Sequence, residues 1–348
     1  MSLRFFYKRL IILIFKLYYG KIKIQKNFLK KKLHINNNLF YHIYEIDNCR
    51  MFTNTNDVAF IKDNKLINGP SIQIRDKGIN AEISKNVVLK TGTPKKYTFY
   101  NCRVFSLLTG IEANNNYFHW FFDSLPRLLL YKKFYNISKK DYFLVQNLKH
   151  DFQIESLKKL GIKNFINAYD IKHIKAKKII AVKFHRGHSD VPQWCIDDLR
   201  KHILKRNINF KKKIKIFLDR SNISSKIRDI YNKKELIKYL IKNNFYIIDP
   251  AKLTLNKEIQ LFYNASIVIG LYGAGLTNMI FCNKKSHIIE LKSSSTDQLY
   301  ENIAKKIGLK FFSLKCKKKN NSFSTRNFDG NINVDILKLS SIIKRLNY

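Results

Sequence analysis

The chain has few cysteines, and no pattern joins them. The five residues Cys49, Cys102, Cys195, Cys282 and Cys316 stand far apart and include no C-x-x-C pair. Disulfide-stapled domains and structural zinc sites depend on cysteines at short, regular spacings. The sequence therefore argues against both and is typical of a protein from a reducing compartment.

No apolar run is long enough to cross a bilayer. The stretch Phe5–Tyr19, FFYKRLIILIFKLYY, is interrupted by Lys8, Arg9 and Lys16, whereas a span needs about 20 apolar residues. The clean core and cleavage site of a signal peptide are also absent. Two interpretations stay open for residues 1–35: a basic amphipathic segment on an anionic membrane surface, or an ordinary helix packed on the domain that follows.

Acidic residues are scarce. The chain has 25 Asp and Glu against 66 Lys and Arg, a formal net charge of +41. Such a balance often indicates a polyanionic partner. Here the excess is mostly lysine, spread over helices and loops, and no nucleic-acid module is recognisable. Nucleic acid is therefore not expected as a partner, although a non-enzymatic binder of nucleic acid or of an anionic membrane surface remains the alternative that charge alone supports.

No internal repeat and no Pro/Gly/Ser-rich linker divide the 348 residues, a length that suits two domains. The Lys-rich stretch Lys205–Lys213 is the expected hinge. In the first half, the pattern predicts one long apolar helix, Asn116–Tyr135, bent by Pro126. It also predicts short strands at Met51–Ile61, Ser71–Arg75, Asn86–Lys90, Tyr142–Gln146 and Ile179–Phe184, and helices at Asp151–Leu160 and Gln193–Lys205.

The second half alternates regularly between strand and helix. The predicted strands are Lys215–Leu218, Phe245–Ile248, Ile267–Leu271, His287–Leu291 and Phe311–Leu314. The predicted helices are Asn232–Asn243, capped by Asn232, Leu255–Asn264, capped by Thr254, Gly275–Cys282, Asp297–Ile307 and a C-terminal helix at Asp335–Leu346. This alternation predicts an α/β domain with a doubly wound parallel sheet, which binds ligands beyond the carboxyl ends of its strands.

Several polar or glycine-rich features stand at those strand ends. The turn Gly273-Ala274-Gly275 joins an apolar strand to a short helix, where exposed N–H groups can bind phosphate. Glu290 ends the next strand, placed for sugar or ribose hydroxyls. Arg220 and Arg228 suit a diphosphate, because guanidinium binds phosphate oxygens bidentately. The glycine turn alone is equally typical of tight helix–strand packing.

These residues occur in one order and spacing that resembles glycosyltransferase family 61. The resemblance is carried by Asp219-Arg220, Arg228, Asn232, Glu235-Leu236, Asn244-Phe245, Pro250, Leu253, Glu258-Ile259, Ala265, Gly273-Ala274-Gly275-Leu276-Thr277-Asn278, Phe281 and Ile289-Glu290-Leu291. Coverage of the first half is thinner and rests on Asn116-Tyr117-Phe118-His119-Trp120, Asp123 and Leu125-Pro126-Arg127. The family often has His where this chain has Tyr272. Tyrosine can donate a hydrogen bond to phosphate but carries no positive charge at neutral pH.

The resemblance implies a GT-B fold, in which two Rossmann-like domains face a cleft. The acceptor-side domain would span residues 36–208, the nucleotide-sugar domain 209–330 and a C-terminal helix 331–348. The implied activity is inverting transfer of a sugar from a nucleotide-sugar to a polysaccharide, glycolipid or other glycan, without a cofactor or metal. No D-x-D pattern is present to hold a divalent ion. The expected location is the cytoplasm or the inner face of the cell membrane.

Inverting transfer needs a general base that deprotonates the acceptor. The candidates are His119 and Asp123, which stand i, i+4 on one helix face. The sequence favours Asp123 as the base and His119 as its partner. It leaves open that the pair only fixes the helix. His119 and Asp123 are the predicted catalytic residues. The predicted nucleotide-sugar site is a separate set, which comprises Arg220, Arg228, Tyr272, Gly273, Ala274, Gly275, Leu276, Thr277, Asn278 and Glu290. A transferase of another activated group and a degenerate transferase that only binds remain alternatives.

Overall fold

The chain is divided into two compact α/β units in a computed structural model. Unit 1 is Met1–His185 and unit 2 is Arg186–Tyr348. The structure describes residues 3–54, 56–75, 79–110, 115–187, 189–204, 213–219, 228–293, 297–318 and 331–346. The expected hinge at 205–213 lies almost wholly outside them. The finer division expected from the sequence, with a boundary near residue 208, stays a prediction.

Unit 1 is built on a large mixed sheet. Its strands are β1 (Lys23–Gln25), β2 (Lys31–Asn36), β3 (Leu39–Thr53), β4 (Asp57–Lys62), β5 (Lys65–Ile67), β6 (Ile72–Arg75), β7 (Ile79–Asn80), β8 (Thr98–Ser106), β9 (Tyr142–Val145), β10 (Phe165–Asn167) and β11 (His173–Lys183). Its helical segments are α1 (Leu3–Tyr19), η2 (Ile83–Lys85), α2 (Val87–Thr91), α3 (Tyr117–His119), η4 (Trp120–Ser124), α4 (Leu125–Phe134) and α5 (Asp151–Lys159).

The sheet of unit 1 combines a parallel and an antiparallel part. Its main path runs β1-β5-β4-β3-β11-β8-β9-β10. Strands β11, β8, β9 and β10 are parallel, as in a Rossmann-like domain. Strand β3 is antiparallel to both β11 and β4. The expectation of a Rossmann-like first domain therefore fits only the parallel part of this sheet.

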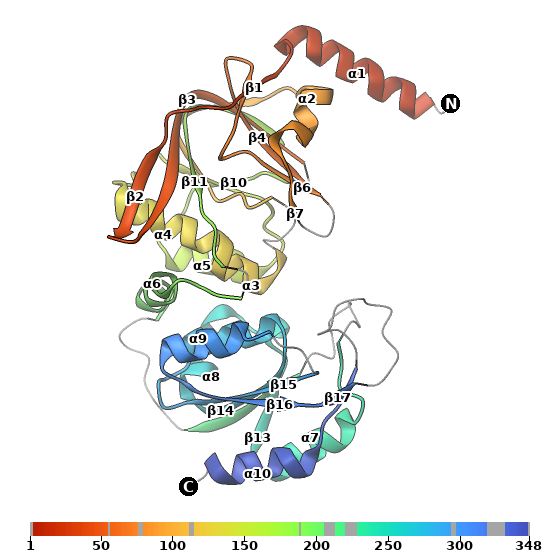
Figure 1. Cartoon of the computed structure of the whole chain (residues 1–348), viewed down its shortest axis with the longest axis vertical. Coiled ribbons are helices and arrows are strands. Elements are labelled where there is room, and N and C mark those ends of the chain that lie inside the picture. Colours follow the sequence, from red (N-terminus) through yellow and green to blue (C-terminus); the bar gives the residue numbers. More distant parts are fainter. Residues whose placement is uncertain are drawn as a thin grey trace. The chain divides into compact units, whose positions relative to one another are not determined.

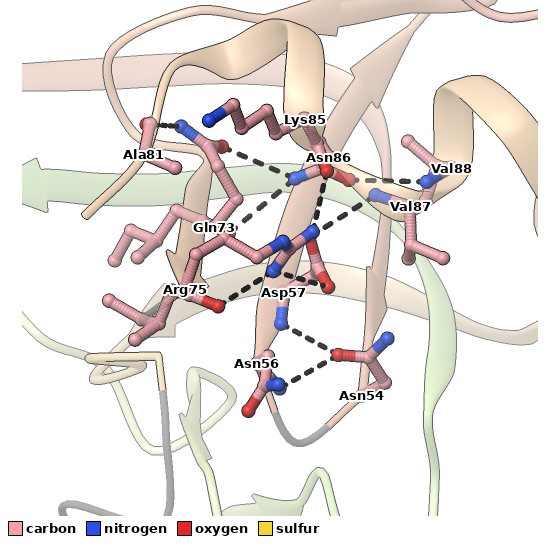
Figure 2. Close-up of polar contacts among 12 residues, drawn as sticks. Asn54, Asn56, Asp57, Gln73, Arg75, Ala81, Lys85, Asn86, Val87 and Val88 are labelled. Carbon is pink, nitrogen blue, oxygen red and sulfur yellow. Dashed lines mark hydrogen bonds and ion pairs between the residues drawn. The ribbon is translucent and has the colours of Figure 1, made fainter. Parts of the chain in front are cut away.

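Two expected strands of the first half were wrong. Met51–Ile61 is not one strand, since it covers the end of β3 and all but the last residue of β4, and Asn86–Lys90 is helical rather than extended. Figure 2 shows the reason for the second difference. The side chain of Asn86 accepts from the N–H of Val88 at 3.3 Å, and Asp57 accepts from the N–H of Val87 at 3.2 Å. These bonds satisfy N–H groups at the start of α2, as helix N-caps do.

The Asp57 carboxylate also holds the strands around α2 together. It forms an ion pair with Arg75, 2.9 Å between Oδ1 and Nη2. The same guanidinium donates to the backbone carbonyl of Lys85 at 2.5 Å (Figure 2). A buried carboxylate with an arginine and a backbone donor is stable without water. This network is therefore a structural element of unit 1 that the sequence did not predict.

Unit 2 contains a parallel five-stranded sheet in the order β13-β12-β14-β15-β16. Its strands are β12 (Ile214–Leu218), β13 (Phe245–Ile248), β14 (Ala265–Leu271), β15 (His287–Lys292) and β16 (Lys310–Lys315), with the short pair β17 (Lys317–Lys318) and β18 (Ile332–Asn333). Its helical segments are α6 (Gln193–Ile203), α7 (Lys233–Lys242), η5 (Pro250–Lys252), α8 (Leu255–Asn264), η6 (Ala274–Phe281), α9 (Leu299–Ile307) and α10 (Ile336–Leu346). All five strands of the main sheet were predicted from the sequence.

Helices cover both faces of this sheet (Figure 1). On one face, buried side chains of the strands pack against Leu236 and Leu240 of α7 and Leu339 and Ile343 of α10. On the other face lie α8 and α9. Strand β14 is apolar and buried from Ile267 to Leu271, as expected for a central strand covered on both sides.

The caps of unit 2 agree with the sequence at two helices and differ at a third. Thr254 caps α8 by accepting from the N–H of Lys257, and Gly308 ends α9 with φ +83°, a left-handed conformation that glycine adopts without strain. Asn232 stands at the N-cap position of α7, as expected, but its side chain makes no capping bond. Its amide instead pairs with the backbone of Val334, donating to the carbonyl at 2.8 Å and accepting from the N–H at 2.9 Å.

Candidate functional site

The carboxyl ends of β12 and β14 form the switch point of the parallel sheet. The two strands are neighbours, with Leu218 opposite Gly270, and the chain leaves them toward opposite sides of the sheet order. Ligands of open α/β sheets bind outside such a point. Asp219 follows β12, and Tyr272 and Gly273 follow β14. The predicted glycine turn therefore stands where the fold itself places a ligand.

The glycine turn has a backbone that only glycine adopts readily. Gly273 has φ 154° and ψ 179°, a region essentially closed to other residues. A 3₁₀ helix, η6, starts immediately at Ala274. Ala274 and Gly275 are half-buried, whereas Leu276, Thr277 and Asn278 are buried. Of the predicted turn residues, only Ala274 and Gly275 are thus partly exposed and placed to meet a ligand, while Gly273 and the last three are buried.

Close packing behind the turn explains a further glycine. A Cβ on Gly270 would lie 2.9 Å from Leu276 Cδ2 and 3.0 Å from Leu218 Cδ1. No side chain fits there without movement of its neighbours. The Thr277 Oγ1 is buried next to this packing without a hydrogen-bond partner in the described part of the chain. Helix–strand packing and the turn are therefore built from the same short segment.

Arg228 contacts the residue that precedes the turn. Its Nη1 donates to the Tyr272 carbonyl at 2.9 Å, and its Cζ lies 5.5 Å from the centroid of the Tyr272 ring. A guanidinium above an aromatic face gains a cation–π contact. The structure thus brings Arg228 to the turn, as predicted. Arg220 lies outside the described residues, so a pair of arginines at this site stays a prediction.

The Tyr272 hydroxyl is engaged by a carboxylate. It donates to Asp297 Oδ2 at 2.5 Å, and Asp297 Oδ1 accepts from the N–H of Leu299 at the start of α9. Burial, followed by the bond to Asp297, raises the pKa of Tyr272 far above its usual value. The tyrosine that stands where the family often has histidine therefore connects β14 to α9 through a neutral hydroxyl.

Glu290 lies deeper than the sequence suggested. It is 1% exposed, and its Oε2 is 3.1 Å from Lys292 Nζ and 3.2 Å from Ser313 Oγ. Lys292 also donates to the carbonyl of Asp297 at 3.0 Å. Burial raises the pKa of Glu290, against the effect of Lys292. This geometry favours a role in holding β15, β16 and Asp297 together over direct contact with a sugar hydroxyl.

Lys292 and Asp297 were missed by the sequence analysis. One local signal existed for Lys292: it stands two residues after Glu290 in the same strand, so both side chains leave the same face. Asp297 carried no such signal, because its partner Tyr272 directly follows β14 and its partner Lys292 ends β15. A second ion pair, 2.5 Å between Lys233 Nζ and Asp219 Oδ1, fixes the end of β12 to the first turn of α7.

His119 and Asp123 lie together in unit 1, as their i, i+4 spacing predicted. His119 Nδ1 is 2.5 Å from Asp123 Oδ2. The side chain of His119 is 39% exposed and that of Asp123 is 20% exposed. No described residue bonds the other ring nitrogen, Nε2. The Asp123 backbone carbonyl accepts from the Arg127 guanidinium.

The helix that carries this pair is locally distorted. The expected single helix consists of α3, the π-helical segment η4 and α4, which starts at Leu125 and has Pro126 in its first turn. Such π-helical turns are frequent at functional sites. Buried neighbours fix the segment: Trp120 Nε1 donates to Ser156 Oγ at 2.8 Å, and Phe121 and Phe122 are fully buried. His119 and Asp123 therefore project from a rigid element.

Comparison with known proteins decides the family. The model of glycosyltransferase family 61 matches residues 117–289, about half of the chain. Residues 117–289 are a glycosyltransferase family 61 domain. The EGF domain-specific O-linked N-acetylglucosamine transferase of Drosophila melanogaster is 29% identical over 90 residues, which cover 25% of this chain and 17% of that relative. The chain thus spans a small part of that relative's length.

The family 61 domain contains the predicted residues of both groups except Glu290. It begins at Tyr117, the first residue of α3, and ends in β15 at Ile289. It therefore includes the His119–Asp123 pair and the Gly273 turn, while Glu290, Lys292 and Asp297 follow its last matched residue. Among the described residues, no three His, Cys, Asp or Glu side chains lie close enough to hold a metal ion.

The backbone of the family 61 domain at Gly273 allows a direct test. Gly273→Ala is expected to destabilise unit 2 by about 1–3 kcal/mol, because alanine is strained at φ 154° and ψ 179°. Gly275→Ala is the matched control, since its Cβ would meet Leu218 Cδ1 at an ordinary 3.7 Å. Thermal unfolding of both variants checks this. Equal melting temperatures for the two would contradict the assigned turn conformation.

Proposed function

We propose that this family 61 domain transfers a sugar from a nucleotide-sugar to a hydroxyl of a polysaccharide, glycolipid or other glycan, with inversion. The observation that carries the proposal is the Gly273 turn, with Arg228 beside it, at the switch point of a parallel sheet. A nucleoside diphosphate suits such a place, because backbone N–H groups and a guanidinium both bind phosphate.

The proposed reaction is a single displacement at the anomeric carbon. The acceptor oxygen forms a bond to this carbon, while the bond to the diphosphate oxygen breaks and its electron pair leaves with the nucleoside diphosphate. Arg228 and the N–H groups of Ala274 and Gly275 stabilise the charge that develops on the leaving group. This compensation needs no divalent ion, so we expect transfer to proceed without one.

His119 is the better candidate for the general base. Its Nδ1 is fixed by Asp123, and its more exposed imidazole offers Nε2 to the acceptor hydroxyl. Asp123 would orient the ring and stabilise the imidazolium that forms, as the carboxylate does in other His–Asp pairs. This reverses the roles that the sequence favoured. It assigns the acceptor to unit 1 and the donor to unit 2, the arrangement of a GT-B enzyme.

Nucleotide-sugars are the donors of such a reaction, and the expected location is therefore the cytoplasm or the inner face of the cell membrane. The substrate of the Drosophila relative, EGF domains, is a property of that protein. For this chain we propose a role in surface or capsular polysaccharide biosynthesis, as the resemblance to family 61 implies.

A nucleotide screen tests the proposal. The purified chain is heated with UDP, GDP, CMP, dTDP and their common sugars, with and without EDTA. A ligand present at 100 times its Kd stabilises the folded state by about 2.7 kcal/mol, a shift on the order of several degrees for a unit of this size. We expect one nucleotide to give this shift and EDTA to leave it unchanged. A response only to oligonucleotides or anionic lipid would contradict the proposed sugar transfer. It would favour a non-enzymatic binder of nucleic acid or of an anionic membrane surface.

A further inference from the structure

Helix α1 carries a continuous apolar stripe that unit 1 does not cover. The helix has no fully buried residue; Ile11, Ile12, Phe15 and Tyr19 are half-buried. The opposite side is exposed and apolar at i, i+3, i+4 and i+7 spacing, which defines one helix face. Its members are Leu3, Phe6, Tyr7, Leu10, Leu13, Ile14, Leu17 and Tyr18, between 43% and 89% exposed. We call this set the α1 stripe. Contiguous apolar surface of this kind marks a docking face.

The helix is attached to unit 1 at its C-terminal end. The Tyr19 ring lies 5.3 Å from the ring of His173 and 5.8 Å from that of Tyr97, centroid to centroid. The Arg50 guanidinium lies 4.7 Å from the Tyr19 centroid, and the Tyr97 N–H donates to the Tyr19 hydroxyl at 3.3 Å. Figure 1 shows the N-terminal part of α1 projecting beyond the strands of unit 1. The α1 stripe is thus exposed to solvent, while contacts of Tyr19 hold the C-terminal end of the helix on unit 1.

The charges around the stripe have one sign. Arg4, Lys8, Arg9 and Lys16 lie on the flanks and on the opposite side of the helix, and no acidic residue precedes Glu45 in the sequence. Cations that flank an apolar face are attracted to anionic lipid headgroups, while the face enters the acyl region. A second copy of the chain would bring the same cations against each other. The charge therefore favours a lipid surface over a second copy.

We propose that α1 lies in the plane of an anionic bilayer surface, with the α1 stripe in the acyl region and its flanking cations at the phosphates. No described helix is long and apolar enough to cross a membrane, and an in-plane helix does not need to be. This inference is independent of the proposed sugar transfer, because it rests on α1 alone. It places unit 1 at the membrane whatever reaction the family 61 domain performs.

Vesicle co-sedimentation of the full chain tests this surface. The vesicles contain either phosphatidylcholine alone or phosphatidylcholine with about one third phosphatidylglycerol. We expect binding to the anionic vesicles, weaker binding to the neutral ones, and a loss as salt is raised. Leu10→Gln/Leu17→Gln removes apolar surface from the stripe without changing charge or helix propensity. We expect it to weaken partition at least about tenfold.

The control removes equally exposed apolar surface elsewhere. Ile241→Gln/Leu337→Gln alters two exposed side chains of α7 and α10, 58% and 82% exposed, and should bind like the parent chain. For every variant, light scattering without lipid measures the oligomeric state, and thermal unfolding without lipid measures the stability of the fold. Unchanged binding of the stripe variant, or equal loss in the control, overturns the proposal. So does a lipid-free dimer that the stripe variant converts to a monomer, which would assign the stripe to a second copy.

Discussion

Arg228→Ala is expected to weaken nucleotide or nucleotide-sugar binding about 10- to 100-fold, since a hydrogen bond to a charged group contributes about 1.5–3 kcal/mol. Arg228 is held at the turn by the Tyr272 carbonyl, 2.9 Å from Nη1, and stands above the Tyr272 ring. A guanidinium has five donors in a fixed fork, so one bond to the backbone positions others for phosphate. Calorimetry or the thermal shift with the best nucleotide measures the loss.

Two variants make this result specific. Arg228→Lys keeps the charge but not the fork, and we expect an intermediate affinity. Arg345→Ala removes the same charge from an exposed position on α10 of the same unit and should bind normally. If Arg228→Ala bound nucleotide as tightly as the Arg345 variant, the diphosphate would have to be placed elsewhere. The melting temperature without ligand separates lost affinity from a loosened turn.

His119→Ala is expected to lower turnover about 100- to 10,000-fold, the range typical of a lost general base. Nucleotide binding should not change, because His119 belongs to unit 1 and the glycine turn to unit 2. Asp123→Asn keeps the shape of the pair but removes the charge that would stabilise the imidazolium, so we expect a smaller loss. Initial rates with a radiolabelled donor and a mixed glycan acceptor pool give both values.

The order of the two effects separates the possible roles. A larger loss in Asp123→Asn than in His119→Ala would make the aspartate the base and return to the assignment favoured by the sequence. Normal rates for both, with lowered melting temperatures, would show that the pair only fixes the π-helical segment. His34→Ala, an exposed histidine on β2, is the matched control and should keep full activity.

The sequence predicted unit 2 well because its signals are local. The strands of the parallel sheet are short, mainly apolar runs. The helices between them are marked by local capping residues, such as Thr254 before α8 and Gly308 after α9. The glycine turn was visible for the same reason. Its neighbours Leu276, Thr277 and Asn278 were taken as part of the binding surface, yet they point inward, since a 3₁₀ helix begins directly at Ala274.

Unit 1 was harder to predict because its order comes from distant pairings. Strand β3 pairs along its length with β11, from Phe52 opposite His173 to His42 opposite Lys183. No local pattern reveals such a register. Strand β8 escaped prediction because it contains polar residues, among them Arg103, which forms an ion pair with Asp141 at 2.6 Å. The network of Tyr272, Asp297 and Lys292 was hidden likewise, since its members meet only after the strands are aligned.

The position of α10 has a consequence for how the chain is made. Leu339 and Ile343 of this last helix complete the core on one face of the unit 2 sheet, and Asn232 is bonded to Val334, about a hundred residues later. Because α10 follows every strand of this sheet in the sequence, it leaves the ribosome after them, at about 5–20 residues per second. Until then the apolar face formed by β12, β14 and β15 is covered by α7 but lacks the side chains of α10. Unit 2 is therefore more exposed to aggregation and chaperone capture until α10 has been made, and chains truncated before α10 would keep that vulnerability.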